Sequence, residues 1–444
     1  MTARKLGFTA AAAIVVANMI GTGVFTSTGF QAASLHDPLT ILIAWVVGGV
    51  LALSGAVAYA ELGAMMPRVG DEYVYLREAY HPVVGVMSGW ASLVAGFSAP
   101  IAAAAMAFAK YTAVIAPGLA GGDTQKIVAI ALILAFTALH SIDVILGGRV
   151  QTWFTAAKTI LIVVFIGAGL LVGSGDWGHF ATHGGGTANI WSNDFAISLM
   201  YVSFAYSGWN AAAYIAGEIE QPERNVPRAL ILGTGAVMAL YVLLNVVFLY
   251  ALGPVALGEG PNGPIVEVGA SAAIGMFGQS AGTLLSTLIA LALVSAVSAM
   301  VMAGPRVYAA MAEDRALPKI LARRSKGGAP LVSVMLQSTI AIAIVILGKF
   351  DEVVRYVGFT LAIFAALTVA GVIVMRFKRP DAARPYRTFL YPLTPILFVA
   401  MSCWVAYAQI KEHPTESLYV LATLVLGAGA YFAAGLHKGE PRAE

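Results

Sequence analysis

The chain has 444 residues, of which 59% are hydrophobic and 11% are charged, and its mean hydropathy is +0.81. Soluble domains contain about 45–50% apolar and about 25% charged residues, so this composition excludes a soluble fold. The formal net charge is only +3, and the basic residues form no continuous patch of the kind that nucleic acid binding requires.

The apolar residues fall into repeated runs near the ~20 residues that an α-helix needs to cross a bilayer. They predict an all-α, polytopic membrane protein that forms a single domain over residues 1–444. We expect about twelve transmembrane helices, at residues 8–30, 39–65, 84–115, 127–146, 150–173, 193–217, 228–252, 281–304, 330–348, 355–375, 391–410 and 417–436.

The middle of the first predicted span, residues 18–25, reads NMIGTGVF and contains an Asn, a Thr and two glycines. Glycine in a helix interior costs about 0.5–1 kcal/mol relative to alanine and permits backbone angles that other residues avoid. Such residues either let two helices pack closely or break the helix. A broken helix inside a membrane has to be covered by protein or to line a cavity.

The fourth and fifth spans carry polar residues. His140 and Asp143 have a metal-like spacing, but two ligands are too few for a site, so we predict no metal. Lys158 lies inside the fifth span, where a charge costs several kcal/mol unless it faces protein or water. It either snorkels to the cytoplasmic face beside Arg149 or faces the protein interior.

The sixth span is interrupted by Ser207 and Gly208. The two interruptions lie in the first members of two five-span sets, residues 8–173 and 193–375, which are followed by two additional helices at 391–436. This is the pattern of an inverted-repeat transporter, in which discontinuous helices meet at the substrate site.

The two interruptions would expose opposite backbone groups. The second half of the first span begins near Gly23, where free N–H groups favour an anion such as a carboxylate. The first half of the sixth span ends near Phe204 and Ala205, where free carbonyl groups accept hydrogen bonds from an ammonium group. Together they predict recognition of a zwitterion, of which a free α-amino acid is the smallest common example.

Lys and Arg are several times more frequent in one set of alternating loops, which by the positive-inside rule places both termini in the cytoplasm. Glu61 and Glu218 lie near the cytoplasmic ends of their spans, and we expect them to pair with loop arginines. The basic residues that we assign to the opposite, outer loops are Lys126, Lys349, Arg355 and Lys411.

Five stretches occur in order along nearly the whole chain: GTGVF, AELGAMMPRVGDEYVYLREAY, FAYSGWNAAAYIAGEIEQPERNVPRA, GPRVYAAMAEDRALPKILA and MRFKRPDAARPYRTFLYP. With them the chain resembles the amino acid–polyamine–organocation (APC) superfamily, and most of all its L-type amino acid transporter branch and the bacterial relatives of that branch. The resemblance implies the LeuT-like fold, a 5+5 inverted repeat, here with two C-terminal helices added.

The resemblance also implies roles for individual residues. Lys158 would replace the sodium ion of sodium-coupled relatives and bridge the first break to the eighth span at Ser295 or Ser298. Ser207, a small neutral residue, favours neutral substrates of modest size. The substrate carboxylate would be received by Gly21, Thr22 and Gly23 beside Met19 and Ile20, and the amino group by Phe204, Ala205, Ser207 and Gly208, with Phe204 as an aromatic gate.

The implied function is secondary transport of neutral, small to medium L-amino acids by alternating access, through sodium-independent exchange or facilitated diffusion. Proton-coupled symport stays open, and a carrier of cationic amino acids or polyamines, or a channel, is more distant. We find no catalytic triad or cofactor motif and predict neither an enzyme nor a cofactor.

Animal relatives join a heavy chain through a cysteine between spans three and four. The corresponding loop here, APGLAGGDTQK, has none, and the only cysteine is Cys403 in the eleventh span. We therefore expect no disulfide-linked heavy chain. The sequence predicts a stand-alone integral protein, surrounded by lipid, in a bacterial inner membrane.

Overall fold

The computed structural model describes residues 6–66, 71–142, 147–181, 190–260, 263–313, 317–325 and 328–436. In these ranges the chain is helical, and extended pairing is limited to isolated bridges such as Leu6 with Ile219. The α-helices are α1 (Phe8–Met19), α2 (Thr22–Leu35), α3 (Pro38–Met65), α4 (Asp71–Ala79), α5 (Pro82–Ala91), α6 (Ala99–Ile115), α7 (Gly122–Ile142), α8 (Gly147–Val172), α9 (Asn193–Tyr206), α10 (Ala211–Tyr214), α11 (Pro222–Gly258), α12 (Val268–Phe277), α13 (Gln279–Glu313), α14 (Leu331–Leu347), α15 (Phe350–Lys378), α16 (Leu393–Glu412) and α17 (Pro414–Ala433).

Over its described residues, each predicted span falls on a helical segment of this list. By length and composition, eight of the described helical stretches can cross a membrane, or nine if the α1–α2 pair, which bends by 41°, is one span. The all-α polytopic fold is therefore confirmed, whereas the number of twelve spans and the cytoplasmic termini stay predictions. The interruption of the sixth span explains part of the difference between the predicted and the observed number of spans. α9 ends after 14 residues and is too short to cross a bilayer alone.

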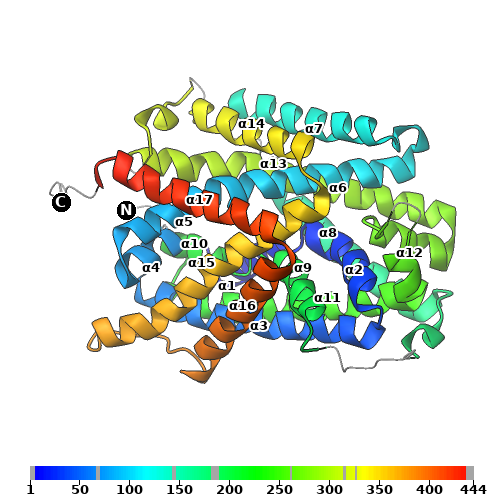
Figure 1. Ribbon diagram of the computed structural model, residues 1–444, viewed down its shortest axis with the longest axis horizontal. Helices are drawn as coiled ribbons and strands as arrows, with labels where there is room; N and C mark the ends of the chain where they lie inside the picture. Colours follow the sequence, from blue (N-terminus) through cyan, green and yellow to red (C-terminus); the bar gives the residue numbers. More distant parts are fainter. Residues whose placement is uncertain are drawn as a thin grey trace.

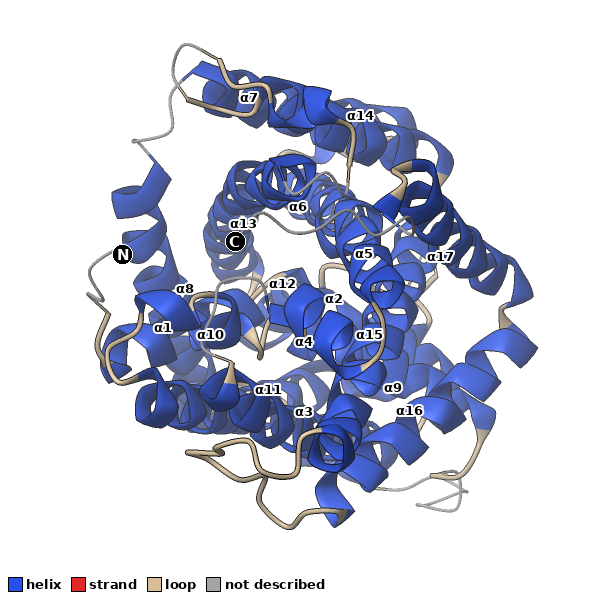
Figure 2. Ribbon diagram, turned by 90° about the vertical axis from the view of Figure 1, so that its left-hand side faces the viewer, coloured by secondary structure: helices blue, strands red, loops and turns tan. Residues whose placement is uncertain are grey.

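The helices form layers that can be followed from one edge of the molecule to the other (Figure 1). α7 and α14 pack together at one edge, and α6 and α13 lie side by side next to them. α3 and α11 form the opposite edge. The short helices α1, α2 and α9 lie between these pairs, and the view turned by 90° shows α2 in the interior and α1 toward one side, next to α8 (Figure 2).

Local sequence explains where two long helices begin and bend. α3 begins after Asp37, whose carboxylate accepts a hydrogen bond from the backbone N–H of Thr40 at 2.7 Å, and Pro38 occupies the first helical position. α11 bends at Gly253, which has φ +68° and precedes Pro254.

Arg355 does not lie in an outer loop as we expected. α15 begins at Phe350, so this arginine lies inside the helix and is 7% exposed. The carboxylates of Asp351 and Glu416 pair with it at 2.9 and 2.6 Å, which explains why a charge is tolerated there. The helices α4 and α12, which connect spans, were also not anticipated.

Candidate functional site

The first interrupted span consists of α1 and α2, which meet at Ile20 and Gly21. Both residues have extended backbone angles, with φ −72° and ψ 90° at Ile20 and φ −134° and ψ −152° at Gly21. Gly21 is the N-cap of α2 and has no side chain that could satisfy the first N–H groups of the helix. These N–H groups and the positive end of the helix dipole are therefore suited to an anion.

The carbonyl groups on the other side of this break are held by side chains from neighbouring helices. The Nζ atom of Lys158, from α8, donates to the carbonyl oxygens of Ala17 and Ile20 at 2.7 and 2.5 Å. The hydroxyl of Tyr241, from α11, donates to the carbonyl of Met19 at 2.5 Å. Lys158 is 6% exposed, so it faces the break and does not snorkel to the membrane surface.

Tyr241 is a residue of the site that was not predicted from the sequence. It lies in an apolar span without a glycine or a charge beside it, and its only signal was a hydroxyl in an otherwise apolar helix. Its ring packs edge-on against Trp45 at 5.6 Å and tilts against Tyr206 at 5.1 Å. The buried aromatic cluster thus fixes the hydroxyl next to the break.

The sixth span is interrupted after α9 ends at Tyr206. Gly208 has φ +92°, a conformation that L-residues with a side chain rarely adopt. The hydroxyl of Ser207 donates to the carbonyl of Phe204 at 2.7 Å, and its backbone N–H donates to the same oxygen at 3.1 Å. The break itself lies where it was predicted, but the Phe204 carbonyl is not free as expected, because Ser207 donates both hydrogen bonds to it.

The two breaks lie in direct contact. A Cβ atom added to Gly23 would lie 2.4 Å from Cα of Ala205, and one added to Gly208 would lie 2.9 Å from the carbonyl of Asn18. Only residues without a side chain fit at both positions, so glycine brings the start of α2 against the end of α9. The N–H groups of one break are in this way brought beside the carbonyl end of the other.

The remaining residues singled out in the sequence lie on α9, α7 and α13 or outside the described part of the chain. Phe204 is 7% exposed and lies in the last turn of α9. Ser295 is buried in α13, and the hydroxyl of Ser298 lies 2.9 Å from Nε2 of His140. Asp143 falls outside the described residues, within which no group of three or more potential metal ligands occurs.

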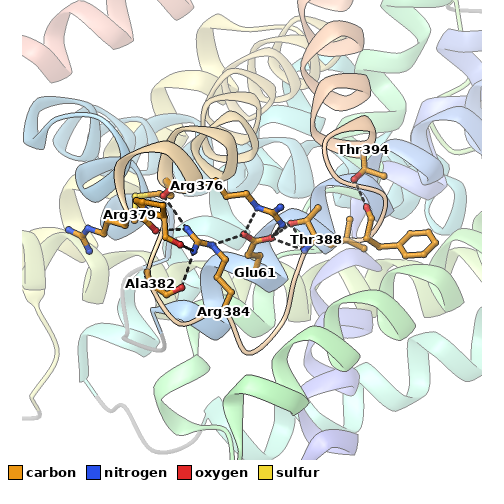
Figure 3. Close-up of polar contacts among 11 residues, drawn as sticks. Glu61, Arg376, Arg379, Ala382, Arg384, Thr388 and Thr394 are labelled. Carbon is orange, nitrogen blue, oxygen red and sulfur yellow. Dashed lines mark hydrogen bonds and ion pairs between the residues drawn. The ribbon is translucent and has the colours of Figure 1, made fainter.

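At the predicted cytoplasmic end of α3, Glu61 is held by residues from the end of α15 and the segment that follows it (Figure 3). Its side chain is 2% exposed. Arg376 donates to its two oxygens at 3.0 and 2.7 Å, the backbone N–H and hydroxyl of Thr388 both donate at 2.7 Å, and Nε of Arg384 lies 3.3 Å away. The expected pairing of Glu61 with arginines is confirmed, whereas that of Glu218 stays a prediction.

A second carboxylate lies on the same side, next to the end of the sixth-span break. Glu72, on α4, accepts a hydrogen bond from the hydroxyl of Tyr59 at 2.5 Å, and Nδ2 of Asn210 lies 3.5 Å from the same oxygen. Burial raises the pKa of the Glu72 carboxyl, although hydrogen bonds from Tyr59 and Ser88 act in the opposite direction. This carboxyl is thus easier to protonate than an exposed one.

A family model described as amino acid permease matches residues 6–429. The chain belongs to this amino acid permease family. It is therefore a member of the APC superfamily, as the sequence predicts, and its relatives are transporters rather than enzymes.

This permease is similar to transporters from animals and bacteria. It is 31% identical over 443 residues to the human b(0,+)-type amino acid transporter 1, and the aligned region covers 97% of this chain and 87% of the relative. It is 30% identical over 408 residues to the serine/threonine exchanger SteT of Bacillus subtilis, which covers 90% of each chain. It is 26% identical over 453 residues to the large neutral amino acids transporter small subunit 2 of Mus musculus, which covers 99% of this chain and 82% of the relative.

Proposed function

We propose that this permease is a secondary transporter that carries neutral, small to medium L-amino acids by sodium-independent exchange or facilitated diffusion. The observation that carries the proposal is the contact between the two breaks, at Gly23 with Ala205 and at Gly208 with Asn18. Two interrupted helices that meet inside a membrane domain are the substrate site of alternating-access carriers with inverted repeats. We accordingly propose the LeuT-like arrangement of two five-helix repeats, residues 8–173 and 193–375, with 391–436 added.

In this proposal the substrate carboxylate binds the N–H groups at Gly21, Thr22 and Gly23, beside Met19 and Ile20. The ammonium group binds at the end of α9, where Phe204, Ala205, Ser207 and Gly208 surround it. A carboxylate in place of Ser207 would attract a cationic side chain, whereas a serine hydroxyl is neutral and small. This favours neutral substrates over cationic amino acids and polyamines.

The proposal of sodium independence rests on Lys158. Its ammonium group is bound to two carbonyl oxygens of the first break, which are the kind of ligand that a sodium ion would use. A fixed positive charge at this point makes a bound sodium ion unfavourable. Ser295 and Ser298 on α13 would complete the environment of the lysine when the helices move.

Proton-coupled symport is the alternative, and two observations favour it. Lys158 is buried at the break, and Glu72 is a carboxyl with a raised pKa near the end of the other break. Either group could bind and release a proton during the cycle. The contact between two broken helices favours a carrier over a channel, which would need a continuous pore with a filter.

We further propose that the protein works in a bacterial inner membrane with both termini in the cytoplasm. The similarity to a Bacillus subtilis exchanger supports this location. A disulfide-linked heavy chain is not expected, since the single cysteine, Cys403, is exposed on α16 and does not lie in a loop between spans three and four.

The test is uptake of a panel of radiolabelled L-amino acids into proteoliposomes, with sodium replaced by choline, with or without internal amino acid, and with an imposed pH gradient. Exchange predicts uptake that requires internal amino acid and does not change with sodium or pH. Uptake into empty vesicles that follows an inward proton gradient would favour the symporter. Absence of uptake for every amino acid would refute the proposed function.

A further inference from the structure

A buried arginine joins three helices at the predicted outer side of the molecule, away from both helix breaks. Arg355 lies in α15 and is 7% exposed. Its Nε and Nη2 atoms donate to one carboxylate oxygen of Glu416, in α17, at 3.1 and 2.6 Å. Its Nη1 atom donates to Asp351 at 2.9 Å and to the hydroxyl of Tyr201, in α9, at 2.8 Å.

Tyr201 in turn connects this arginine to the half-helices of the substrate site. It lies in α9, one turn before Phe204, and its backbone carbonyl accepts a hydrogen bond from Ser27 of α2 at 3.3 Å. Its ring stacks on Phe30 of α2 with 5.3 Å between centroids and 6° between planes. α2 and α9 are thus joined to each other at the same residue that contacts α15.

The same boundary contains a second contact. The ring of Phe30 also stacks on Phe350, the first residue of α15, with 5.9 Å between centroids and 20° between planes. The Tyr201–Arg355 hydrogen bond and the Phe30–Phe350 ring contact both hold the α2–α9 pair against α15. For the proposed site to open outward, the outer halves of the two broken spans have to separate from their neighbours, and these contacts oppose that movement.

The bonds of Arg355 differ in how easily they can be broken. Removing the arginine from Glu416 would leave two buried charges unpaired, which is strongly unfavourable, and the half-buried Asp351 would lose its ion pair as well. Removing it from Tyr201 breaks one hydrogen bond to a neutral hydroxyl, and the guanidinium keeps both of its carboxylate partners. The neighbouring Tyr356 also holds α15 against α17, because its hydroxyl lies 2.8 Å from the hydroxyl of Thr423 in α17.

We propose that Tyr201 and Arg355, with Phe30 and Phe350 beside them, form a releasable outer latch between the α2–α9 pair and α15. The latch is closed when the substrate site is shut to the outside and opens each time the site faces outward, while Glu416 of the additional helix α17 keeps Arg355 in place. Tyr201 is a positioning residue and does not touch the substrate. The inference rests on the proposed alternating-access function.

The test uses two matched variants. Tyr201→Phe removes only the hydroxyl that meets Arg355 and keeps the ring stack. Tyr356→Phe is the control, because it removes a buried hydroxyl from the residue next to Arg355 but affects only the α15–α17 contact. In a Cys403→Ser background, nitroxide labels at His36→Cys and Lys349→Cys report the separation of α2 and α15 by pulsed electron paramagnetic resonance. Both labelled positions are exposed helix-terminal residues.

We expect Tyr201→Phe to increase the ratio of long to short label distances at least about tenfold, the typical effect of one hydrogen bond from a charged donor. In exchange assays the apparent KM on the outer side should fall and the KM on the inner side should rise, because the outward-open fraction increases. Tyr356→Phe should change neither. A general loss of structure would instead impair exchange from the outer side and from the inner side together.

An unchanged distance distribution in Tyr201→Phe, or an equal change in Tyr356→Phe, would overturn the latch. The distances do not depend on transport. Failure of the unaltered protein to exchange amino acids would therefore refute the proposed function without being mistaken for failure of the latch contact.

Discussion

The contact between the two breaks predicts a specific effect of Gly23→Ala. The new Cβ would lie 2.4, 2.8 and 2.9 Å from Cα, Cβ and N of Ala205, whereas carbon atoms pack favourably at about 3.5–4.0 Å. Because these contacts include backbone atoms, α2 and α9 would have to move apart by about 1 Å. Overpacking of this kind costs about 1–3 kcal/mol, and the helix propensity of alanine returns only about 0.5–1 kcal/mol.

With the middle of each range, the net loss is about 1 kcal/mol, which corresponds to a factor of about 5 in the population of the closed arrangement. We expect Gly23→Ala to weaken binding of a transported amino acid by this factor and to lower the melting temperature. Gly429→Ala is the control, since this glycine lies in α17 and a Cβ atom added to it would meet no other atom within 4 Å, and it should leave both quantities unchanged or slightly raise stability. Normal binding and melting in Gly23→Ala would refute the proposed contact of the breaks.

Three further variants test other parts of the site. Lys158→Met removes two charge-assisted hydrogen bonds, each worth about 1.5–3 kcal/mol, and should reduce amino acid binding at least about 100-fold in an equilibrium binding assay; near-normal binding would contradict its role at the break. Gly208→Ala forces alanine into φ +92° against Asn18 and should reduce both exchange rate and melting temperature; unchanged values of both would show that the turn tolerates a side chain. Glu61→Gln removes the charge that pairs with Arg376, so it should lower the melting temperature and increase proteolysis of residues 379–392. Substrate affinity should be retained. Unaltered proteolysis would argue that Glu61 does not hold this segment.

Much of the fold could be predicted because a membrane span leaves a strong local signal. Among the described residues, the apolar runs of suitable length are helical, and both interruptions lie where glycine and polar residues enter an apolar run. Gly208 could be recognised because a glycine that interrupts an apolar span often marks a backbone conformation that other residues avoid. Its φ of +92° is such a conformation. These features depend on neighbours in the sequence, which is why the sequence alone reveals them.

Residues that act through distant partners could not be predicted in the same way. Tyr241 looks like any tyrosine in an apolar span until α11 is placed beside the carbonyl of Met19. Arg355 looked like a loop residue because Glu416, the more buried of its two carboxylate partners, is 61 residues away in the chain. The same limit applies to Ser298, whose partner His140 lies in a different helix.

The central claim is that the two breaks together bind a zwitterion, and competition with modified substrates tests it most directly. Exchange of radiolabelled L-alanine in proteoliposomes would be measured against unlabelled L-alanine, its methyl ester and N-acetyl-L-alanine. The methyl ester cannot offer a carboxylate to α2, and the N-acetyl compound cannot offer an ammonium group to α9. The proposed site predicts that both compete at least about 100-fold more weakly than L-alanine, since each leaves a charged hydrogen-bonding interaction unmade. Competition by either compound at the strength of L-alanine would contradict it.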